Sequence, residues 1–335
     1  MKITVFGSGY VGLVTGAAGF IGSHVCARLS QLGHSVHGCD NFNSYYDPAL
    51  KRARVASLLT SARVPCGAVE LADAQAVRTL FAEVKPSAVI HLAAQAGVRY
   101  SIDHPQAYIQ SNVVGFANVL EACRQLRVQH LVYASSSSVY GDRADPPFSE
   151  SQRTDSPVSL YAATKKANEL MAHVYSHLHG LRATGLRFFT VYGPWGRPDM
   201  AYFSFAQRIC ARQPLPVFGH GTLQRDFTYI DDIVEGVVRL ASNQAPAGAP
   251  AHEVFDIGNH QPVTVLKFIE TLAAQLGIEP VLQMLPMQPG DVTITCADVD
   301  KLRERVGFEP STPLAEGLRR FVEWFRPWNA GARPA

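Results

Sequence analysis

The sequence predicts an α/β protein built on a doubly wound parallel sheet, with a smaller C-terminal domain. Three observations support this prediction. Over the first 190 residues short apolar runs alternate with amphipathic stretches, a glycine-rich turn separates the first run from the first such stretch, and prolines punctuate the chain after residue 192. Alternation of this kind is typical of βαβ units, in which a crossover helix returns the chain to a parallel strand.

The apolar pattern predicts where the individual elements lie. Strands are expected at 11–15, 34–39, 66–71, 87–92, 130–135 and 183–190. Helices are expected at 22–32, 48–59, 74–84, 106–126, 161–179, 201–212, 231–242, 264–276 and 313–326, the last capped by Thr312 with Pro313 in its first turn. We expect a first domain over 1–192, a second mainly over 193–327 with some later segments packing back on the first, and a tail at 328–335.

Composition excludes several classes of partner. The 335 residues are 47% hydrophobic and carry a net charge of +2 with both signs scattered, which indicates a globular chain without a basic stripe for nucleic acid or anionic membranes. The six cysteines stand apart without a C-x-x-C, which favours a reducing compartment and no metal site. With no long apolar span and no secretory pattern at the N-terminus, the expected location is the cytoplasm.

Two neighbouring glycine patterns compete for the role of a dinucleotide-binding turn. Gly7-Ser-Gly-Tyr-Val-Gly12 fits G-x-G-x-x-G literally, but β-branched residues and further glycines follow it and make a poor helix start. Gly16-Ala-Ala-Gly19-Phe20-Ile21-Gly22 precedes an amphipathic stretch that ends at Gly33. Because the pyrophosphate binds at a helix N-terminus, the second turn is the predicted site and residues 1–10 are a surplus leader.

An acidic residue supports a Rossmann-type NAD site. Asp40 ends the next apolar run, at about the twenty-residue distance at which a carboxylate holds the adenosine ribose, and no arginine lies beside it, which favours NAD over NADP. Ligands bind beyond the carboxyl ends of the strands in such a sheet. The expected NAD contacts are therefore Gly16, Gly19, Phe20, Ile21, Gly22, Asp40, Asn41, Leu71, Leu92, Ala93, Tyr161 and Lys165.

Tyr161 and Lys165 begin a predicted helix at positions i and i+4, which places the phenol and the ammonium on one face. A nearby cation is expected to lower the pKa of the phenol, which then serves as a general base toward a sugar hydroxyl. The spacing alone also occurs by chance in many helices. Upstream, the serines at 135–138 follow the apolar run that ends near Tyr133, so a hydroxyl is expected at a strand end.

Together these residues resemble the extended short-chain dehydrogenase/reductase family. Its glycine-rich turn, strand-end hydroxyl and Tyr-x-x-x-Lys correspond here to Gly16/Gly19/Gly22, Ser136 and Tyr161/Lys165, and the resemblance extends from Gly12 to about Trp324. It implies that Ser136, Tyr161 and Lys165 are catalytic and that the chain forms a homodimer through 106–126 and 161–179. Dehydrating and decarboxylating relatives carry acids where Ser137 and Ser138 stand, so the resemblance implies epimerisation rather than elimination.

Segments of the second half resemble the UDP-glucuronate 4-epimerases of that family: Arg187–Ala201, Gln224–Asp232 and Gln288–Asp291. The resemblance implies a nucleotide-sugar substrate. Ser138 and Thr190 are expected to bind a sugar carboxylate, Arg197 to pair with it or to remain a solvated loop residue, and Arg225 to hold the diphosphate. Arg99 and Asp291 complete the expected substrate contacts.

Some features depart from the family pattern. Glu70 replaces an aspartate expected near the adenine, and neutral Gln288 replaces an arginine before Pro-Gly-Asp. His91 and Trp195 are expected to be packing residues. Residues 1–13 resemble the N-terminus of UDP-glucose dehydrogenases, so Gly7 and Gly9 are expected to contact no cofactor.

The expected activity is thus NAD-dependent 4-epimerisation of UDP-glucuronate to UDP-galacturonate through a 4-keto sugar. Two alternatives remain open at this stage. One is another nucleotide-sugar enzyme, either a 4-epimerase for a different sugar or a UDP-glucuronate decarboxylase. The other is a non-catalytic NAD-binding sensor, because a fold does not fix a function.

Overall fold

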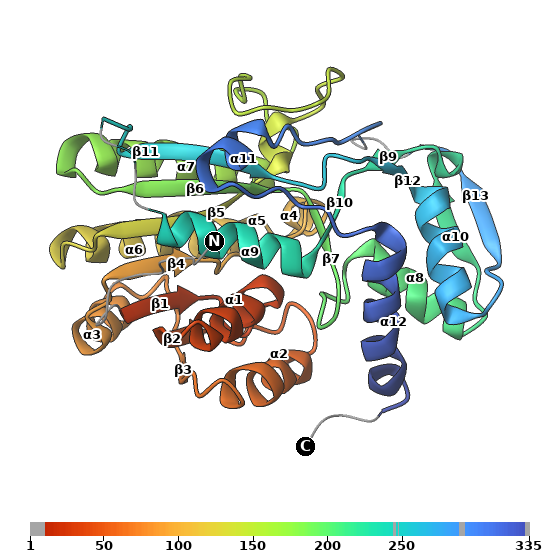
Figure 1. The fold of residues 1–335 in the computed structure, drawn as a ribbon, viewed down its shortest axis with the longest axis horizontal. Coiled ribbons are helices and arrows are strands. Elements are labelled where there is room, and N and C mark those ends of the chain that lie inside the picture. Colours follow the sequence, from red (N-terminus) through yellow and green to blue (C-terminus); the bar gives the residue numbers. More distant parts are fainter. Residues whose placement is uncertain (1–10, 244–245, 247, 288–291, 332–335) are drawn as a thin grey trace.

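A computed structural model describes residues 11–243, 246, 248–287 and 292–331 of the chain. Within these ranges seven parallel strands form one sheet in the order β11-β6-β5-β4-β1-β2-β3 (Figure 1). The strands are β1 (Val11–Thr15), β2 (Ser35–Asp40), β3 (Cys66–Ala68), β4 (Ala88–His91), β5 (His130–Ser136), β6 (Ala183–Phe188) and β11 (His252–Ile257). The order runs outward from β1 in both directions, as in a doubly wound Rossmann sheet.

Helices cover both faces of this sheet. On one face α1 (Phe20–Gln31) packs against α9 (Ile230–Ser242), which in turn contacts α11 (Asp300–Val306). The other face is covered by α3 (Ala74–Val84), α6 (Gly115–Gln125) and α7 (Leu160–His179). Successive side chains of a strand point to opposite faces, so both must be apolar in a sheet covered on both sides. In β1, Leu13 belongs to the core under α6 and Val14 to the core under α1.

The smaller domain lies beside the carboxyl end of the sheet, at the right of Figure 1. Its helices are α8 (Ala201–Cys210), α10 (Val265–Leu276) and α12 (Leu314–Asn329). Three two-stranded pairs accompany them: β7 (Thr190–Tyr192) with β10 (Phe227–Tyr229), β8 (Leu215–Phe218) with β13 (Leu282–Leu285), and β9 (Gln224–Arg225) with β12 (Val263–Thr264). The apolar core under α1 and α9 continues without a break into this domain.

Short elements complete the described chain. They are α2 (Pro48–Arg54) with a π-helical turn over Val55–Thr60, α4 (Tyr100–Asp103), α5 (Pro105–Tyr108), a π-helical turn over Ile109–Val114, and 3₁₀ turns at Ser137–Tyr140 and Gly219–Gly221. None of the helices in the described ranges combines the length and the apolar character that crossing a bilayer requires.

Three predicted boundaries were wrong for identifiable reasons. Strand β3 ends at Ala68 instead of continuing to 71, and Glu70 lies in the following turn, where its carboxylate accepts the backbone N–H of Ala72. The predicted strand 183–190 is divided at Phe189, because the N–H of Thr190 donates to Asp226 and the chain leaves the main sheet to pair with β10. Where one helix was predicted over 106–126, helical structure begins at Tyr100. It is interrupted at His104 and is π-helical over 109–114.

Near the C-terminus the observed helices differ from the predicted ones. Helix α11 was missed because its seven residues are too few for a clear apolar period. Pro313, not Thr312, is the N-cap of α12. This helix extends to Asn329, so the predicted tail begins too early. Trp328 packs against Trp195 and Trp324 with ring centroids 5.8 Å away in both cases.

Candidate active site

A cleft of about 650 Å³ opens at the carboxyl ends of the parallel strands and extends to the smaller domain. All the predicted site residues in the described part of the chain line it; Asp291 and the substituted Gln288 lie outside that part. The lining includes Gly16, Gly19, Phe20, Ile21, Gly22, Asp40, Asn41, Leu71, Leu92, Ala93, Arg99, Ser136, Ser138, Tyr161, Lys165, Thr190, Arg197 and Arg225.

The glycine turn between β1 and α1 has the close packing that a phosphate-binding turn requires. Gly16 has φ +71°, and a Cβ there would lie 2.7 Å from the backbone nitrogen of Ala93. A Cβ on Gly22 would collide with the carbonyl of Gly16, so helix and turn meet backbone to backbone. Gly19 caps α1 without a side chain, which leaves the first N–H groups of the helix available to an anion.

Asp40 closes one end of the cleft at the tip of β2. Its Oδ1 accepts the backbone N–H of Phe42 at 2.8 Å and the ammonium of Lys51 at 3.3 Å. Lys51 also donates to Asn43 at 2.9 Å. The carboxylate is therefore held in one orientation by a buried cation, an arrangement suited to a ribose diol. Nearby, the Asn41 amide donates to Glu70 at 2.8 Å, so the extra methylene of Glu70 still allows a contact across this end.

The three predicted catalytic residues come from β5 and α7. Ser136 ends β5, and its Oγ accepts the backbone N–H of Ser138 at 3.2 Å, which fixes the serine turn. Helix α7 begins at Leu160, with Ser159 as its N-cap, so Tyr161 and Lys165 lie on its first turns. The Lys165 ammonium is buried and donates to the carbonyl of Ala134 on β5 at 2.8 Å. This bond ties the helix to the strand that carries Ser136.

The pKa of Tyr161 differs from the sequence expectation. Burial raises it, whereas a hydrogen bond with Ser136 and the charge of Arg197 lower it, with a net upward shift. The expected lowering by Lys165 was wrong, because burial outweighs the cationic effects and the cation acting on the phenol is Arg197. Burial also lowers the pKa of Lys165 to about 8, so this ammonium keeps most of its charge at neutral pH.

The other end of the cleft brings together the predicted substrate residues. Thr190 opens β7, Arg225 ends β9 and Arg99 precedes α4, with its guanidinium 5.7 Å from the ring centroid of Phe218. Arg197 lies between the sheet and α8, in an ion pair with Asp199 at 2.7 Å. This end therefore combines small hydroxyls from Ser136, Ser138 and Thr190 with several cations, a suitable arrangement for an anionic sugar joined to a diphosphate.

Comparison with known proteins identifies the family. Residues 12–258 match the NAD-dependent epimerase/dehydratase family. The chain belongs to this family. It is 47% identical to UDP-glucuronate 4-epimerase 4 of Arabidopsis thaliana (98% of this chain, 78% of the relative) and 46% identical to the probable UDP-glucuronate 4-epimerase of Rhizobium meliloti strain 1021 (93% and 96%). The crystal structure of UDP-glucuronic acid 4-epimerase from Bacillus cereus, in complex with UDP-glucuronic acid and NAD, is similar, with a TM-score of 0.88 and 32% identity over 95% of this chain and 99% of that one.

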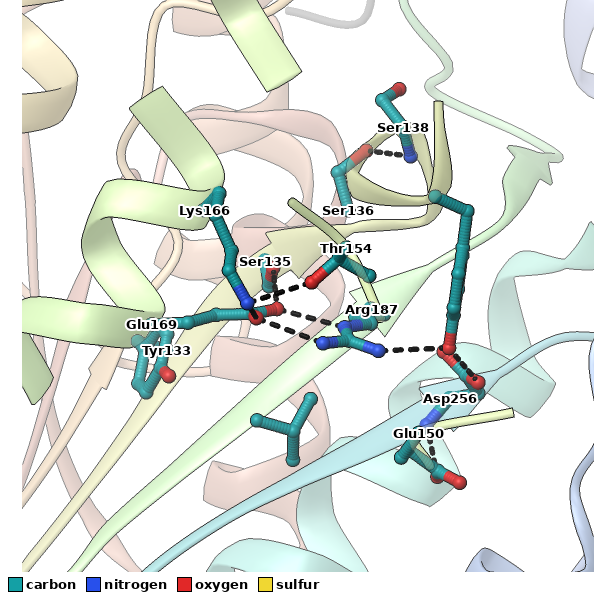
Figure 2. Close-up of polar contacts among 12 residues, drawn as sticks. Tyr133, Ser135, Ser136, Ser138, Glu150, Thr154, Lys166, Glu169, Arg187 and Asp256 are labelled. Atoms are coloured by element: carbon teal, nitrogen blue, oxygen red, sulfur yellow. Dashed lines mark hydrogen bonds and ion pairs between the residues drawn. The ribbon is translucent and has the colours of Figure 1, made fainter. Parts of the chain in front are cut away.

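Behind the predicted catalytic residues lies a buried polar network (Figure 2). Glu169 on α7 accepts the hydroxyl of Ser135 at 2.6 Å and two N–H groups of Arg187 on β6. Arg187 also donates to the hydroxyl of Tyr140, which donates to Asp256 on β11 at 2.5 Å. The network joins α7, β5, β6 and β11 immediately under the serine turn, so it fixes the positions of the elements that carry Ser136 and Tyr161.

Sequence reasoning missed three residues of this site: Tyr45, Lys51 and Arg54. Tyr45 and Lys51 line the cleft, and Arg54 is fully buried against the 195–196 backbone. All three follow Asp40 in one polar loop and a short helix. No sequence pattern in this segment indicates which residues they contact. The two residues expected to be packing residues are buried: His91 shares a hydrogen bond with Thr15 at 2.9 Å, and the ring centroid of Trp195 lies 5.2 Å from that of Trp324.

Proposed function

We propose that the chain is an NAD-dependent 4-epimerase that interconverts UDP-glucuronate and UDP-galacturonate. The observation that carries this proposal is the composition of the cleft around Tyr161. Ser136, Ser138 and Thr190 are uncharged hydroxyls, and Arg197 faces the same space. Ser137 and Ser138 stand at the positions that acids occupy in dehydrating and decarboxylating relatives. The cleft thus offers a base and a place for a sugar carboxylate, with no carboxylic acid at those positions to promote elimination.

The residues divide the chemistry in a defined way. Tyr161 removes the proton of the sugar 4-hydroxyl, while Ser136 hydrogen-bonds the same phenol and orients it. Lys165 contributes a buried positive charge and ties α7 to β5. The resulting 4-keto sugar turns about the bonds to the diphosphate, and Tyr161 returns the proton after the opposite face has been reduced. Arg225 and Arg99 hold the diphosphate during this turn.

The residues at the glycine turn fit NAD. Gly16, Gly19 and Gly22 bring the backbone close to a pyrophosphate, and Asp40 is poised for the diol of an adenosine ribose. NAD supplies the acceptor for the C4 hydride and returns it, so no external oxidant is consumed. The network around Glu169 fixes the position of Tyr161 relative to the NAD end of the cleft.

A single incubation tests the activity. Purified protein is mixed with UDP-glucuronate, and the uronic acids are resolved by chromatography. We expect UDP-galacturonate to appear until the two sugars reach a constant ratio. UDP-xylose would instead indicate a decarboxylase, and no turnover by NAD-replete protein would indicate a binding sensor. A fully active Tyr161→Phe variant would contradict the assigned base.

We further propose that the enzyme forms a homodimer through α6 and α7. Leu170, Val174 and Leu178 form an exposed apolar stripe on α7, spaced at one helical turn, with 56%, 47% and 65% of their surfaces exposed. A second copy covers this stripe by a two-fold contact. Light scattering should give the mass of two chains, and a Leu170→Lys/Leu178→Lys variant should give one.

We place the enzyme in the cytoplasm. All six cysteines are free thiols, including buried Cys26 and Cys123, which suits a reducing compartment. Fractionation of the source cells with an antibody to the chain tests this placement.

A further inference from the structure

The guanidinium of Arg197 forms an ion pair with Asp199, a residue outside the cleft. Its Nε donates to Asp199 Oδ1 at 3.1 Å and its Nη2 to Asp199 Oδ2 at 2.7 Å, a bidentate pair. Arg197 lines the cleft and Asp199 does not. About a quarter of each side chain is exposed, so the pair is largely removed from water. Arg197 therefore faces the sugar site with its charge already partly neutralised.

Tyr45 is a second donor to Asp199. Its hydroxyl donates to Asp199 Oδ2 at 3.0 Å, the oxygen that also accepts Arg197 Nη2. The Tyr45 ring lies 4.7 Å from that of Tyr100, and its hydroxyl packs where a side chain on Gly97 would lie. Burial and the charge of Asp199 raise the pKa of Tyr45, so the phenol remains a donor at neutral pH. The carboxylate is thus fixed by two donors from different parts of the chain.

The backbone before Arg197 is fixed as well. Arg54 on α2 donates to the carbonyls of Trp195 at 2.8 Å and Gly196 at 3.0 Å, and a third hydrogen bond reaches Ala18 in the glycine turn. The backbone N–H of Met200 donates to the carbonyl of Arg197, which closes the turn into α8. A change of partner by Arg197 therefore needs movement of its side chain only.

We propose that Asp199 is a positioning residue that competes with the substrate carboxylate for Arg197, with Tyr45 holding the competitor in place. This inference rests on the proposed function, in which a uronate enters the cleft beside Arg197. A cation without a competing anion would bind the carboxylate strongly in the ground state and hinder the turn of the 4-keto sugar. An interaction that is made with the bound substrate and lost as the 4-keto sugar turns lowers KM and kcat together, because it stabilises the ground state and not the transition state. Asp199 gives the guanidinium a second partner and lets the carboxylate leave.

The test separates affinity from turnover. In Asp199→Asn the amide keeps the size of the side chain but loses its charge. We expect kcat for UDP-glucuronate to fall about fivefold and KM to fall by a similar factor, the scale of one partly exposed ion pair. Affinity is measured by calorimetry in a Tyr161→Phe background, which stops turnover. There Asp199→Asn should tighten UDP-glucuronate about fivefold and leave UDP-glucose unchanged, because only the uronate carries a carboxylate.

Two further variants keep the test independent of folding. Tyr45→Phe retains the ring contact with Tyr100 but removes the donor to Asp199, and should shift KM and kcat in the same direction by a smaller factor. The matched control is Asp145→Asn, because Arg143 and Asp145 form the same Nε/Nη2 bidentate pair with the same spacing away from the cleft. This control should behave as wild type.

The outcomes distinguish the inference from the function on which it rests. If wild-type protein produces no UDP-galacturonate, the proposed function fails. If wild type turns over while Asp199→Asn leaves KM and uronate affinity unchanged, or tightens UDP-glucose equally, the competition is excluded and Asp199 has only a structural role.

Discussion

Arg187 on β6 donates two hydrogen bonds to the carboxylate of Glu169 on α7, from Nε at 2.8 Å and from Nη2 at 2.9 Å. Both side chains are 5% exposed, so neither charge is solvated by water. Glu169 lies one helical turn beyond Lys165 on α7. It accepts the hydroxyl of Ser135, next to Ser136 at the end of β5 (Figure 2). The Glu169–Arg187 pair therefore couples the stability of the sheet to the placement of α7, which carries Tyr161 and Lys165.

Removing one charge of this pair should be strongly destabilising. Glu169→Gln removes the carboxylate that is hydrogen-bonded to the buried Arg187 charge, which we expect to cost about 3–5 kcal/mol of unfolding free energy. Denaturant unfolding measures this loss. Glu121→Gln, which breaks the exposed i,i+3 pair with Arg124, is the control and should cost less than about 1 kcal/mol. Equal losses in the two variants would show that the buried pair contributes no more to the unfolding free energy than the exposed pair does.

The same pair predicts how stability depends on pH. Burial raises the pKa of Glu169, but the hydrogen bonds and charge of Arg187 outweigh it, so the pKa lies below its usual value of 4.5. A carboxyl group with a depressed folded pKa stabilises the protein above its unfolded pKa and loses that contribution as the pH falls through the folded value. The difference in unfolding free energy between wild type and Glu169→Gln should therefore be constant near pH 7 and shrink below pH 4.5. A difference that grows on acidification would contradict this sign.

The pH profile of activity should report the surroundings of Tyr161. Ser136 and Arg197 both lower the pKa of the phenol against the effect of burial. Replacing either, in Ser136→Ala or Arg197→Gln, should move the rising limb of kcat/KM to higher pH, because more base is then needed to form the phenolate. The readout is the pH of this inflection and not the rate itself, and the profile must extend into the alkaline range beyond about pH 10, because the pKa of Tyr161 is shifted upward. Arg303→Gln removes an exposed arginine on α11 and should keep the wild-type inflection.

Much of this site is predictable because its residues belong to local patterns. The glycine turn, Asp40 at a strand end, Ser136 at another and the Tyr161/Lys165 pair each depend on near neighbours in the sequence. The contacts of Tyr45 with Asp199 and of Arg54 with Trp195 join segments far apart in the chain, and nothing in either segment signals the other. The direction of the Tyr161 pKa depended on burial, which the spacing of a helix does not reveal.

Lys51 should contribute to NAD affinity, although it belongs to no NAD-binding sequence motif. It is buried and donates to Asp40 and Asn43, which fixes the carboxylate expected to hold the ribose. Lys51→Met removes a charged hydrogen bond, and we expect NAD affinity to fall about tenfold. Calorimetric titration of NAD-stripped protein measures the change, with Lys267→Met on α10 as the control. An unchanged affinity would show that Asp40 needs no such support.

The choice between the two glycine patterns can be decided by a deletion and a substitution. Residues 1–10 lie outside the described part of the chain, whereas Val11 already pairs with Ser35 and begins the strand that leads into the working turn. We expect protein lacking residues 2–10 to bind NAD as the full chain does. Gly16→Ala should abolish binding, because the added Cβ meets the backbone of Leu92 and Ala93 at a φ of +71°. Gly33→Ala is the matched control: it has the same sign of φ but no atom within 4 Å of the added Cβ, so it should cost stability and leave NAD binding intact. Loss of NAD on the deletion would instead assign the cofactor to Gly7 and Gly9.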